Sequence, residues 1–418
     1  MDLKQSLEKL FSLHTFGIKL GLDNIRKFLE HIGNPQTSLK AFHIAGSNGK
    51  GSTSAFIASI LMEAGYKVGL YTSPHFVRFN ERIIINGKYI EDEFIADFIN
   101  KHNDFIDKHE LTFFEVTTAM AFEYFKTKKV DYVVIETGLG GRLDATNVLN
   151  PLASIITSIS LEHTNILGDK ISQIAFEKAE IIKPHAKVFI GKLSDEAESV
   201  VEKKCESVKA KLFRLEDYLI EKNGIVELYT EEIELQDWEI PLKGKYQRYN
   251  AALAVLSVTK TLDIDDPRIV YDGIKNVIKN TLIQGRYEYI RKQPFILLDS
   301  AHNPDGLKVF LNEFQQERKN YSKVFLLFSA LKDKDIDSMI KLLSDQFDNY
   351  YLTEINYERA EKLDDLKKRF EASNIKAETV IDKRKFISDF LKGDKNNCLV
   401  ITGSMYLLGE IKSILEEL

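Results

Sequence analysis

The sequence has little cysteine, no long apolar run and no basic tract. The two cysteines among 418 residues, Cys205 and Cys398, lie far apart and outside any Cys-x-x-Cys spacing, so neither a disulfide framework nor a zinc cluster is expected. No stretch approaches ~20 uninterrupted apolar residues, and the N-terminal residues lack a basic start followed by an apolar core. We therefore expect a cytoplasmic protein that does not associate with membranes.

The charge balance argues against nucleic acid as a partner. The formal net charge is −6, and no basic cluster of nucleic-acid-binding type is present. A small anionic substrate remains compatible with this balance, because a binding site can be locally positive. The hydrophobic content of 44% is ordinary for a globular protein, and the length favours two domains.

Strand-like and helix-like patterns alternate along most of the chain. Nearly continuous apolar runs, typical of parallel strands covered on both faces, lie at 40–46, 67–73, 130–138, 153–160 and 186–191. Between them, the segments 91–107, 117–128 and 171–182 have helical spacing, and the alternation predicts an α/β fold. Residues 223–240 indicate short antiparallel strands, and a strong helix is expected from Asn250 onward.

A second α/β series begins near residue 287. We place the domain boundary within 281–285, which gives an N-terminal domain of residues 1–283 and a C-terminal domain of residues 284–418.

The stretch "AFHIAGSNGKGST" predicts a phosphate-binding turn. Residues 41–45 form a short apolar strand, residues 46–51 form the turn, and Ser52 and Thr53 open a helix with one apolar stripe. Glycines allow the backbone to wrap around phosphate oxygens at a helix N-terminus. Lys50 supplies a positive charge, and Ser52 supplies a hydroxyl for magnesium. The alternative is an ordinary glycine-rich turn between a strand and a helix.

The spacing departs from the usual G-x-x-x-x-G-K-[ST] pattern, because Ile44 occupies the first glycine position and Gly51 follows Lys50. Seven further motifs occur in order: "YTSPHFVRFNERI", "ETGLGGRLDATN", "LEHTNILG", "FEKAEIIKP", "YQRYNAALA", "GRYE" and "LDSAHNPDG". Together they resemble the folylpolyglutamate synthase/dihydrofolate synthase branch of the Mur ligase superfamily, over nearly the whole chain. The resemblance implies a P-loop-type ATPase domain with a mostly parallel sheet, followed by a smaller Rossmann-like α/β domain.

Three residues near strand ends are candidate metal ligands. Glu136 ends one apolar run, whereas Ser73 and His163 follow others, and the carboxyl ends of parallel strands face the ligand crevice. A turn-capping role for Glu136 and a structural role for His163 are the alternatives from spacing. The resemblance implies that all three bind Mg²⁺. Since magnesium prefers oxygen ligands, a histidine indicates a manganese-tolerant site.

Lys178 has two interpretations. Its position on an amphipathic segment favours a solvated helix lysine. The resemblance implies instead the lysine that is often carbamylated in this superfamily, which would support a second magnesium ion.

The resemblance also implies roles for other residues. Asn48, Gly49, Lys50, Gly51, Ser52, Asn250, Arg286 and Asp299 would contact ATP, with Asp299 near the ribose, although this residue could instead cap a helix. His302 and Ser404 would lie near the incoming glutamate, with His302 grouped with Lys50 and Lys178 as catalytic. Phe114 and Asp144 would contact the pterin.

The implied activity is an ATP-dependent amide ligation that adds L-glutamate to dihydropteroate or to a folate through an acyl phosphate. Such an enzyme would serve folate biosynthesis and one-carbon metabolism as a cytoplasmic monomer. A small-molecule kinase, a nucleotide-binding regulatory protein and another Mur-type amino-acid ligase remain as alternatives. Only ~45 residues precede the loop, fewer than the separate ~100-residue UDP-binding domain expected of a cell-wall ligase.

Overall fold

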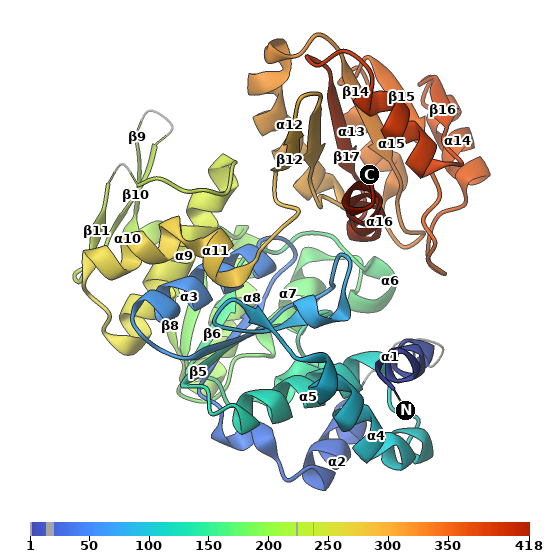
Figure 1. Cartoon of the computed structure of the whole chain (residues 1–418). Helices are drawn as coiled ribbons and strands as arrows, with labels where there is room; N and C mark the ends of the chain where they lie inside the picture. The colour runs from blue at the N-terminus through green and yellow to red at the C-terminus, as the bar shows by residue number, and fades with distance from the viewer. Residues whose placement is uncertain (1, 14–20, 223–224, 237) are drawn as a thin grey trace. The chain divides into compact units, whose positions relative to one another are not determined.

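The computed structural model describes residues 2–13, 21–222, 225–236 and 238–418, and divides into two compact units (Figure 1). The first unit comprises Met1–Pro74, Asn80–Pro241 and Arg248–Ile283. The second comprises His75–Phe79, Leu242–Gln247 and Gln284–Leu418. Two short segments that precede residue 284 in the chain therefore belong to the second unit.

The first unit is built on an eight-stranded sheet with the order β4-β3-β2-β5-β1-β6-β7-β8. Six neighbouring strands, from β2 to β8 in that order, run parallel, whereas β3 and β4 are antiparallel at one edge. The strands are β1 (Ala41–Ala45), β2 (Val68–Tyr71), β3 (Ile83–Ile85), β4 (Lys88–Tyr89), β5 (Tyr132–Glu136), β6 (Ala153–Ile156), β7 (Lys187–Ile190) and β8 (Lys211–Arg214). All five strands expected from apolar runs are confirmed.

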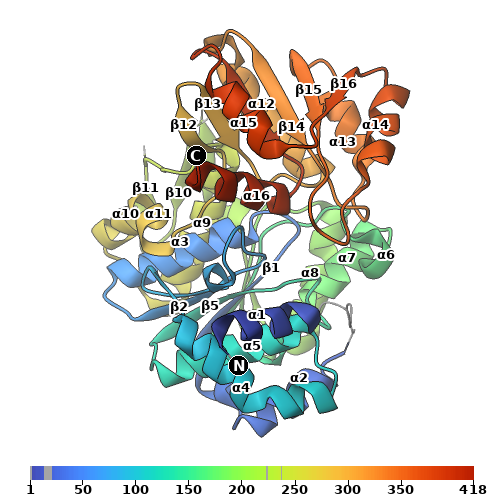
Figure 2. The same cartoon turned by 45° about the vertical axis from the view of Figure 1, so that its right-hand side comes forward.

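Helices of the first unit pack on the sheet and on one another (Figure 2). They are α1 (Leu3–Ser12), α2 (Asp23–His31), α3 (Lys50–Glu63), α4 (Asp92–Lys108), α5 (Phe113–Thr127), α6 (Thr164–Leu167), α7 (Ile171–Ala179), α8 (Asp195–Val208), α9 (Lys245–Leu262), α10 (Pro267–Lys275) and α11 (Val277–Thr281). Within the described part of the chain, no helix has the length and apolar character needed to cross a bilayer.

The helix that follows the turn at residues 46–49 is buried on all sides, so the single apolar stripe expected for it is wrong. Every residue from Ser52 to Leu61 is buried, because α3 packs against β1, β2 and β5 on one side and against α10 and α11 on the other. It begins at Lys50, two residues before the expected start. The small residues of its sequence allow this close packing.

A separate three-stranded antiparallel sheet follows β8, as the sequence predicted, with the order β11-β10-β9. Its strands are β9 (Leu219–Lys222), β10 (Ile225–Tyr229) and β11 (Glu234–Leu235), and residues 223, 224 and 237 of the predicted segment lie outside the described residues. The next helix, α9, starts at Lys245 rather than at Asn250. Gly244, with φ of +105°, lies directly before the helix.

The second unit contains a six-stranded sheet with the order β12-β13-β17-β14-β15-β16, parallel except for β12. Its elements are β12 (Glu288–Lys292), β13 (Phe295–Leu298), α12 (Pro304–Glu317), β14 (Val324–Phe328), α13 (Ile336–Leu343), β15 (Asn349–Leu352), α14 (Leu363–Ala372), β16 (Ala377–Thr379), α15 (Lys383–Leu391), β17 (Cys398–Thr402) and α16 (Met405–Glu416). One buried core joins the sheet to α12, α13 and α14, and the other joins it to α15 and α16. This two-sided covering accounts for the continuous apolar strands.

Candidate active site

The loop between β1 and α3 needs glycine at two positions. Gly46 has φ of +156°, and a Cβ there would lie 1.9 Å from Oγ1 of Thr157. Gly49 has φ of +86°, and a Cβ there would lie 2.5 Å from Oδ1 of Asn250. These close approaches hold the loop against β6 and α9, and they bring two residues expected to bind ATP, Gly49 and Asn250, side by side.

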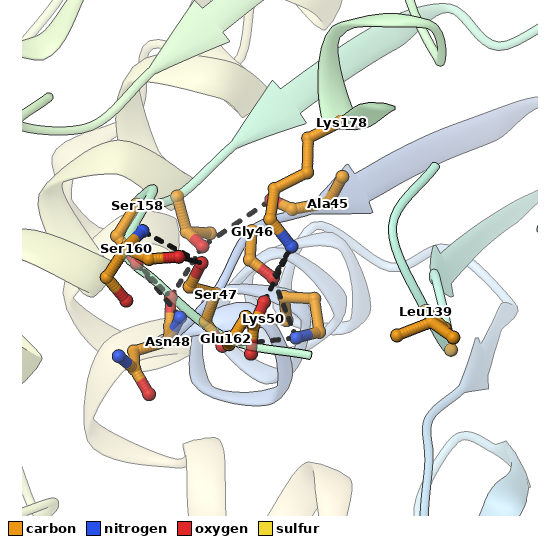
Figure 3. Close-up of polar contacts among 12 residues, drawn as sticks. Ala45, Gly46, Ser47, Asn48, Lys50, Leu139, Ser158, Ser160, Glu162 and Lys178 are labelled. Carbon is orange, nitrogen blue, oxygen red and sulfur yellow. Dashed lines mark hydrogen bonds and ion pairs between the residues drawn. The ribbon is translucent and has the colours of Figure 1, made fainter. Parts of the chain in front are cut away.

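Serine and threonine side chains after β6 fix the backbone of the loop (Figure 3). Ser47 donates its backbone N–H to the Ser158 carbonyl at 2.8 Å, and its Oγ accepts the N–H of Ser160 at 3.0 Å. Asn48 donates its N–H to Ser158 Oγ at 2.9 Å, while its carbonyl accepts the Thr157 hydroxyl at 2.6 Å. The loop is therefore held by both side-chain and backbone hydrogen bonds, and the first backbone N–H groups of the helix that follows are of the kind that can donate to a phosphate.

Lys50 lies at the first position of α3 and folds back over the loop. Its Nζ donates to the carbonyl oxygens of Gly46 at 2.8 Å and Ser47 at 3.3 Å (Figure 3). Gly51 and Ser52 complete the first helical turn, where the helix dipole favours negative charge. The ammonium group and the helix N-terminus thus lie together at a site suited to phosphate.

Lys178 is buried, so the interpretation of this residue as a solvated helix lysine is wrong. Its side chain is 1% exposed, and its Nζ donates to Glu162 Oε1 at 2.7 Å and to the Gly46 carbonyl at 2.9 Å. Both Lys178 and Lys50 therefore contact the same carbonyl of the phosphate loop (Figure 3).

The carboxylate of Glu162 interacts with the charges of two ammonium groups, those of Lys178 and Lys50. Burial alone would raise the pKa of Glu162, yet the charges of Lys178 and Lys50 lower it overall. Burial lowers the pKa of Lys178; Glu162 opposes this shift, and Lys50 adds to it. Glu162 therefore stays ionised, and Lys178 loses its proton more easily than an exposed lysine.

Two of the three expected metal ligands meet in the first unit. Glu136 ends β5 and is buried, and its Oε2 accepts the backbone N–H of Ser73 at 3.2 Å. The carboxylate and the serine hydroxyl are hard oxygen donors of the kind that Mg²⁺ and Mn²⁺ prefer. His163 lies beyond β6, with φ of +47°, directly before α6. Among the described residues, no group of three or more His, Cys, Asp and Glu side chains is arranged to hold a metal ion, so a site here would depend on the serine hydroxyl.

Asp144 organises the loop that follows β5. Its Oδ2 accepts the N–H groups of Gly138 and Leu139, each at 2.8 Å, and its Oδ1 accepts the N–H of Thr146 at 3.0 Å. Burial raises the pKa of Asp144, although these hydrogen bonds oppose the shift. Phe114 lies against the same loop, since a Cβ on Gly138 would be 2.5 Å from Phe114 Cζ. The two residues expected to contact the pterin, Phe114 and Asp144, thus border one loop. Both carboxylate oxygens of Asp144 accept hydrogen bonds from the backbone of that loop.

In the second unit, Asp299 is buried at the end of β13. Its Oδ2 accepts the N–H of Tyr287 at 2.9 Å, and its Oδ1 accepts the N–H of Ala301 at 2.9 Å. Burial raises the pKa of Asp299 to about 6, although these two N–H groups and Arg286 oppose the shift. The expected alternative of helix capping does not hold, because Asn303 caps α12 by accepting the N–H of Gly306 at 2.8 Å.

The two residues expected near glutamate follow the ends of neighbouring strands. His302 Nδ1 lies 2.9 Å from the Ser300 carbonyl in the loop after β13. Ser404 follows β17, is buried, and caps α16 by accepting the N–H of Tyr406 at 3.2 Å. Because β13 and β17 are paired and parallel, both residues lie at the carboxyl edge of the sheet.

Sequence reasoning missed Glu162 and the serines of the loop network. Glu162 stands beside His163 in the motif "LEHTNILG", so a carboxylate after a buried strand was the available signal. Ser158 and Ser160 also follow that strand, but short polar residues after a strand are typical of any loop.

Two family models match this chain, one after the other along the sequence. Residues 44–258 match the Mur ligase middle domain, and residues 285–405 match the Mur ligase glutamate ligase domain. The dihydrofolate synthase/folylpolyglutamate synthase of Bacillus subtilis is 38% identical over 416 residues, which cover 96% of each chain. Escherichia coli FolC in complex with DHPP and ADP has a TM-score of 0.88 at 26% identity, with coverage of 100% of this chain and 98% of that chain. A bifunctional folylpolyglutamate synthase/dihydrofolate synthase with Mn, AMPPNP and L-glutamate bound has a TM-score of 0.86 at 27% identity, with the same coverage.

The two domain matches define an ATP-dependent amino-acid ligase of the Mur type. Within this class, the chain belongs to the folylpolyglutamate synthase/dihydrofolate synthase family.

Proposed function

We propose that this chain uses ATP to join L-glutamate to dihydropteroate or to a folate. The observation that carries the proposal is the loop from Gly46 to Ser52, in which the N-terminus of a buried helix and the Lys50 ammonium lie together. A carboxylate is a poor electrophile, so the γ-phosphoryl group of ATP would first be transferred to it. The glutamate amine would then attack the acyl phosphate, and phosphate would leave through a tetrahedral intermediate.

The residues of the phosphate loop would position the γ-phosphoryl group. Lys50 would exchange its contacts with the carbonyls of Gly46 and Ser47 for phosphate oxygens, which are stronger acceptors for an ammonium group. Gly49 and Asn250 would border the nucleotide, and Ser52 would present its hydroxyl. Because the loop is fixed by surrounding side chains, little reorganisation would accompany transfer.

A divalent cation would be held by the oxygens of Ser73 and Glu136, with His163 as a further ligand. Such an ion neutralises charge on the phosphates and orients them when it is bound. Lys178 would contribute to a second magnesium site as a carbamate, in which its neutral amine adds to CO₂ and releases one proton. The depressed pKa of Lys178 favours the neutral amine that this reaction needs.

The first domain, residues 1–283, would bind ATP, and the second, residues 284–418, would supply Arg286 and Asp299 to the nucleotide. His302 and Ser404 would bind the glutamate, while Phe114 and Asp144 would border the pterin. A two-domain enzyme can exclude water from the acyl phosphate, which would otherwise hydrolyse. We further propose a cytoplasmic monomer.

The proposal is tested by the mass of the products. Dihydropteroate, tetrahydrofolate and their monoglutamates are incubated separately with ATP, Mg²⁺ and L-glutamate. At least one substrate should gain the mass of one glutamyl residue, and the panel tells whether the chain acts on the pteroate, on the folate or on both. A product that instead gains the mass of a phosphoryl group in the absence of glutamate would identify a kinase and contradict the ligase assignment.

A further inference from the structure

Arg142 is a partly exposed cation in the loop that carries Asp144. Its side chain is 41% exposed, whereas its backbone is held on both sides. The backbone N–H of Arg142 donates to the Glu177 carbonyl at 2.8 Å, and the Arg142 carbonyl accepts Nδ2 of Asn147 at 3.0 Å. The motif "GLGGRLDATN" thus presents a guanidinium group from a fixed backbone, and no step of the proposed reaction uses it.

Gly141 brings this loop close to α7. A Cβ on Gly141 would lie 2.7 Å from the Glu177 carbonyl oxygen and 3.1 Å from the Lys178 carbonyl oxygen. Glu177 and Lys178 are consecutive residues of α7, and the Lys178 ammonium donates to the Gly46 carbonyl at 2.9 Å. All of these residues belong to the first unit. Arg142 therefore lies beside the helix that also contacts the phosphate loop.

Glu177 orients the guanidinium group without occupying all of its hydrogen-bond donors. Nε of Arg142 donates to Glu177 Oε1 at 3.0 Å, and Nη2 lies 2.9 Å from the same oxygen. A guanidinium group has five N–H donors, so three of them have no partner among the residues that the structure describes. A planar guanidinium group with N–H donors to spare is suited to a carboxylate, which it can bind through two parallel hydrogen bonds.

An exposed aromatic ring borders the guanidinium group. Phe176 precedes Glu177 in α7 and is 49% exposed, and its ring centroid lies 6.0 Å from the guanidinium carbon of Arg142. The ring shields one side of the cation from water, which strengthens the attraction of the cation for an anion. An oriented guanidinium group beside an exposed aromatic ring is suited to an anionic group on a molecule that also has apolar surface.

We propose that Arg142 binds a carboxylate of the glutamyl residue that a folate carries, and so favours folates over dihydropteroate. This inference rests on the proposed function, because it takes dihydropteroate and folates as the ligands. The single carboxylate of dihydropteroate is the group to be phosphorylated, so it must lie at the phosphate loop. The glutamyl residue of a folate has two carboxylates, of which only one reacts. The other needs a cation away from the γ-phosphate, and Arg142 supplies it.

The test compares the binding of dihydropteroate and dihydrofolate, which differ by one glutamyl residue, to the full chain by calorimetric titration. AMPPNP and Mg²⁺ are present at saturation and L-glutamate is omitted, so no ligation occurs. Arg142→Gln should weaken binding of dihydrofolate by about 10-fold, as expected for the loss of a charge-assisted hydrogen bond, and should change that of dihydropteroate by less than about twofold. Arg142→Lys, which keeps the charge but not the planar donor pair, should recover part of the loss.

Glu177→Gln is the matched control, because it removes the same ion pair from its other side. It should keep or tighten the affinity for dihydrofolate, since the guanidinium group loses its internal competitor. If Glu177→Gln weakens dihydrofolate binding as much as Arg142→Gln does, the ion pair only holds the loop on α7 and the inference is overturned.

Two other results would also overturn the inference: an unchanged affinity for dihydrofolate in Arg142→Gln, or equal weakening of both ligands. Because the titration needs no turnover, a wild-type chain that binds dihydrofolate but adds no glutamate to any substrate would contradict the proposed function and leave this comparison intact. A wild-type chain that binds neither ligand would contradict both.

Discussion

The ion pair between Lys178 and Glu162 gives a prediction whose size follows from burial. The two side chains are 1% and 5% exposed, and their charged atoms lie 2.7 Å apart. Glu162→Gln removes the carboxylate and leaves a buried ammonium group without its counter-charge. Loss of one partner of a buried pair costs about 3–5 kcal/mol, so the free energy of unfolding should fall by about that amount at pH 7.

The loss of unfolding free energy in Glu162→Gln should be smaller at higher pH. Without Glu162, the pKa of Lys178 in the folded chain lies further below that of an unfolded lysine, so the unfolded chain binds more protons and stability rises with pH. Each pH unit above the folded pKa recovers at most about 1.4 kcal/mol until the unfolded lysine also deprotonates near pH 10. The deficit at pH 9 should therefore be clearly smaller than at pH 7.

Urea unfolding followed by tryptophan fluorescence isolates this effect. Trp238 is the one tryptophan of the chain, lies in the first unit and is 1% exposed, so its emission reports unfolding of the unit that holds the pair. Glu91→Gln is the control, since Glu91 pairs with Lys128 at 2.7 Å on the surface and should cost below about 1 kcal/mol. The double variant Glu162→Gln/Lys178→Met should recover most of the loss. Equal midpoints for Glu162→Gln and wild type at both pH values would refute the reasoning.

Three further predictions concern the two units. Lys50→Ala should abolish phosphate release from ATP, while its free energy of unfolding in urea should stay within about 1 kcal/mol of wild type. A fully active variant would contradict the assignment of the phosphate loop. Gly49→Ala should weaken AMPPNP binding, because its Cβ would stand 2.5 Å from Asn250 Oδ1 at a φ of +86°. Burial raises the pKa of Asp299 to about 6, so the folded chain binds a proton that the unfolded chain has released. The stability that this carboxyl contributes is present below about pH 4 and is lost as the pH rises through 6. In calorimetric unfolding, Asp299→Asn should remove this fall of the unfolding free energy between pH 4 and 6. An unchanged fall in the variant would contradict the assignment.

Much of the fold could be predicted because the strands are buried on both faces. Runs such as Ala41–Ala45 and Ala153–Ile156 are apolar except for His43 and Ser154 and show no alternation, which is the pattern expected of strands in a sheet covered on both sides. The start of α9 could not be predicted, because "KGKYQRYN" has no apolar periodicity before Asn250.

The candidate site was only partly predictable, because its contacts join residues far apart in sequence. The helical spacing around Lys178 is that of a surface helix, and nothing local indicates that its ammonium meets Glu162 and the Gly46 carbonyl. In the same way, no local pattern indicates that Phe76 packs with Gly285 and Gly409 in the second unit. Tertiary packing determines both contacts.

The most direct measurement of the central claim is phosphate release from ATP with each substrate omitted in turn. The account predicts strong release only when L-glutamate is present together with dihydropteroate or a folate, because the acyl phosphate is protected until the amine attacks it. Equal release in the absence of glutamate would contradict the account and indicate a kinase or a hydrolase.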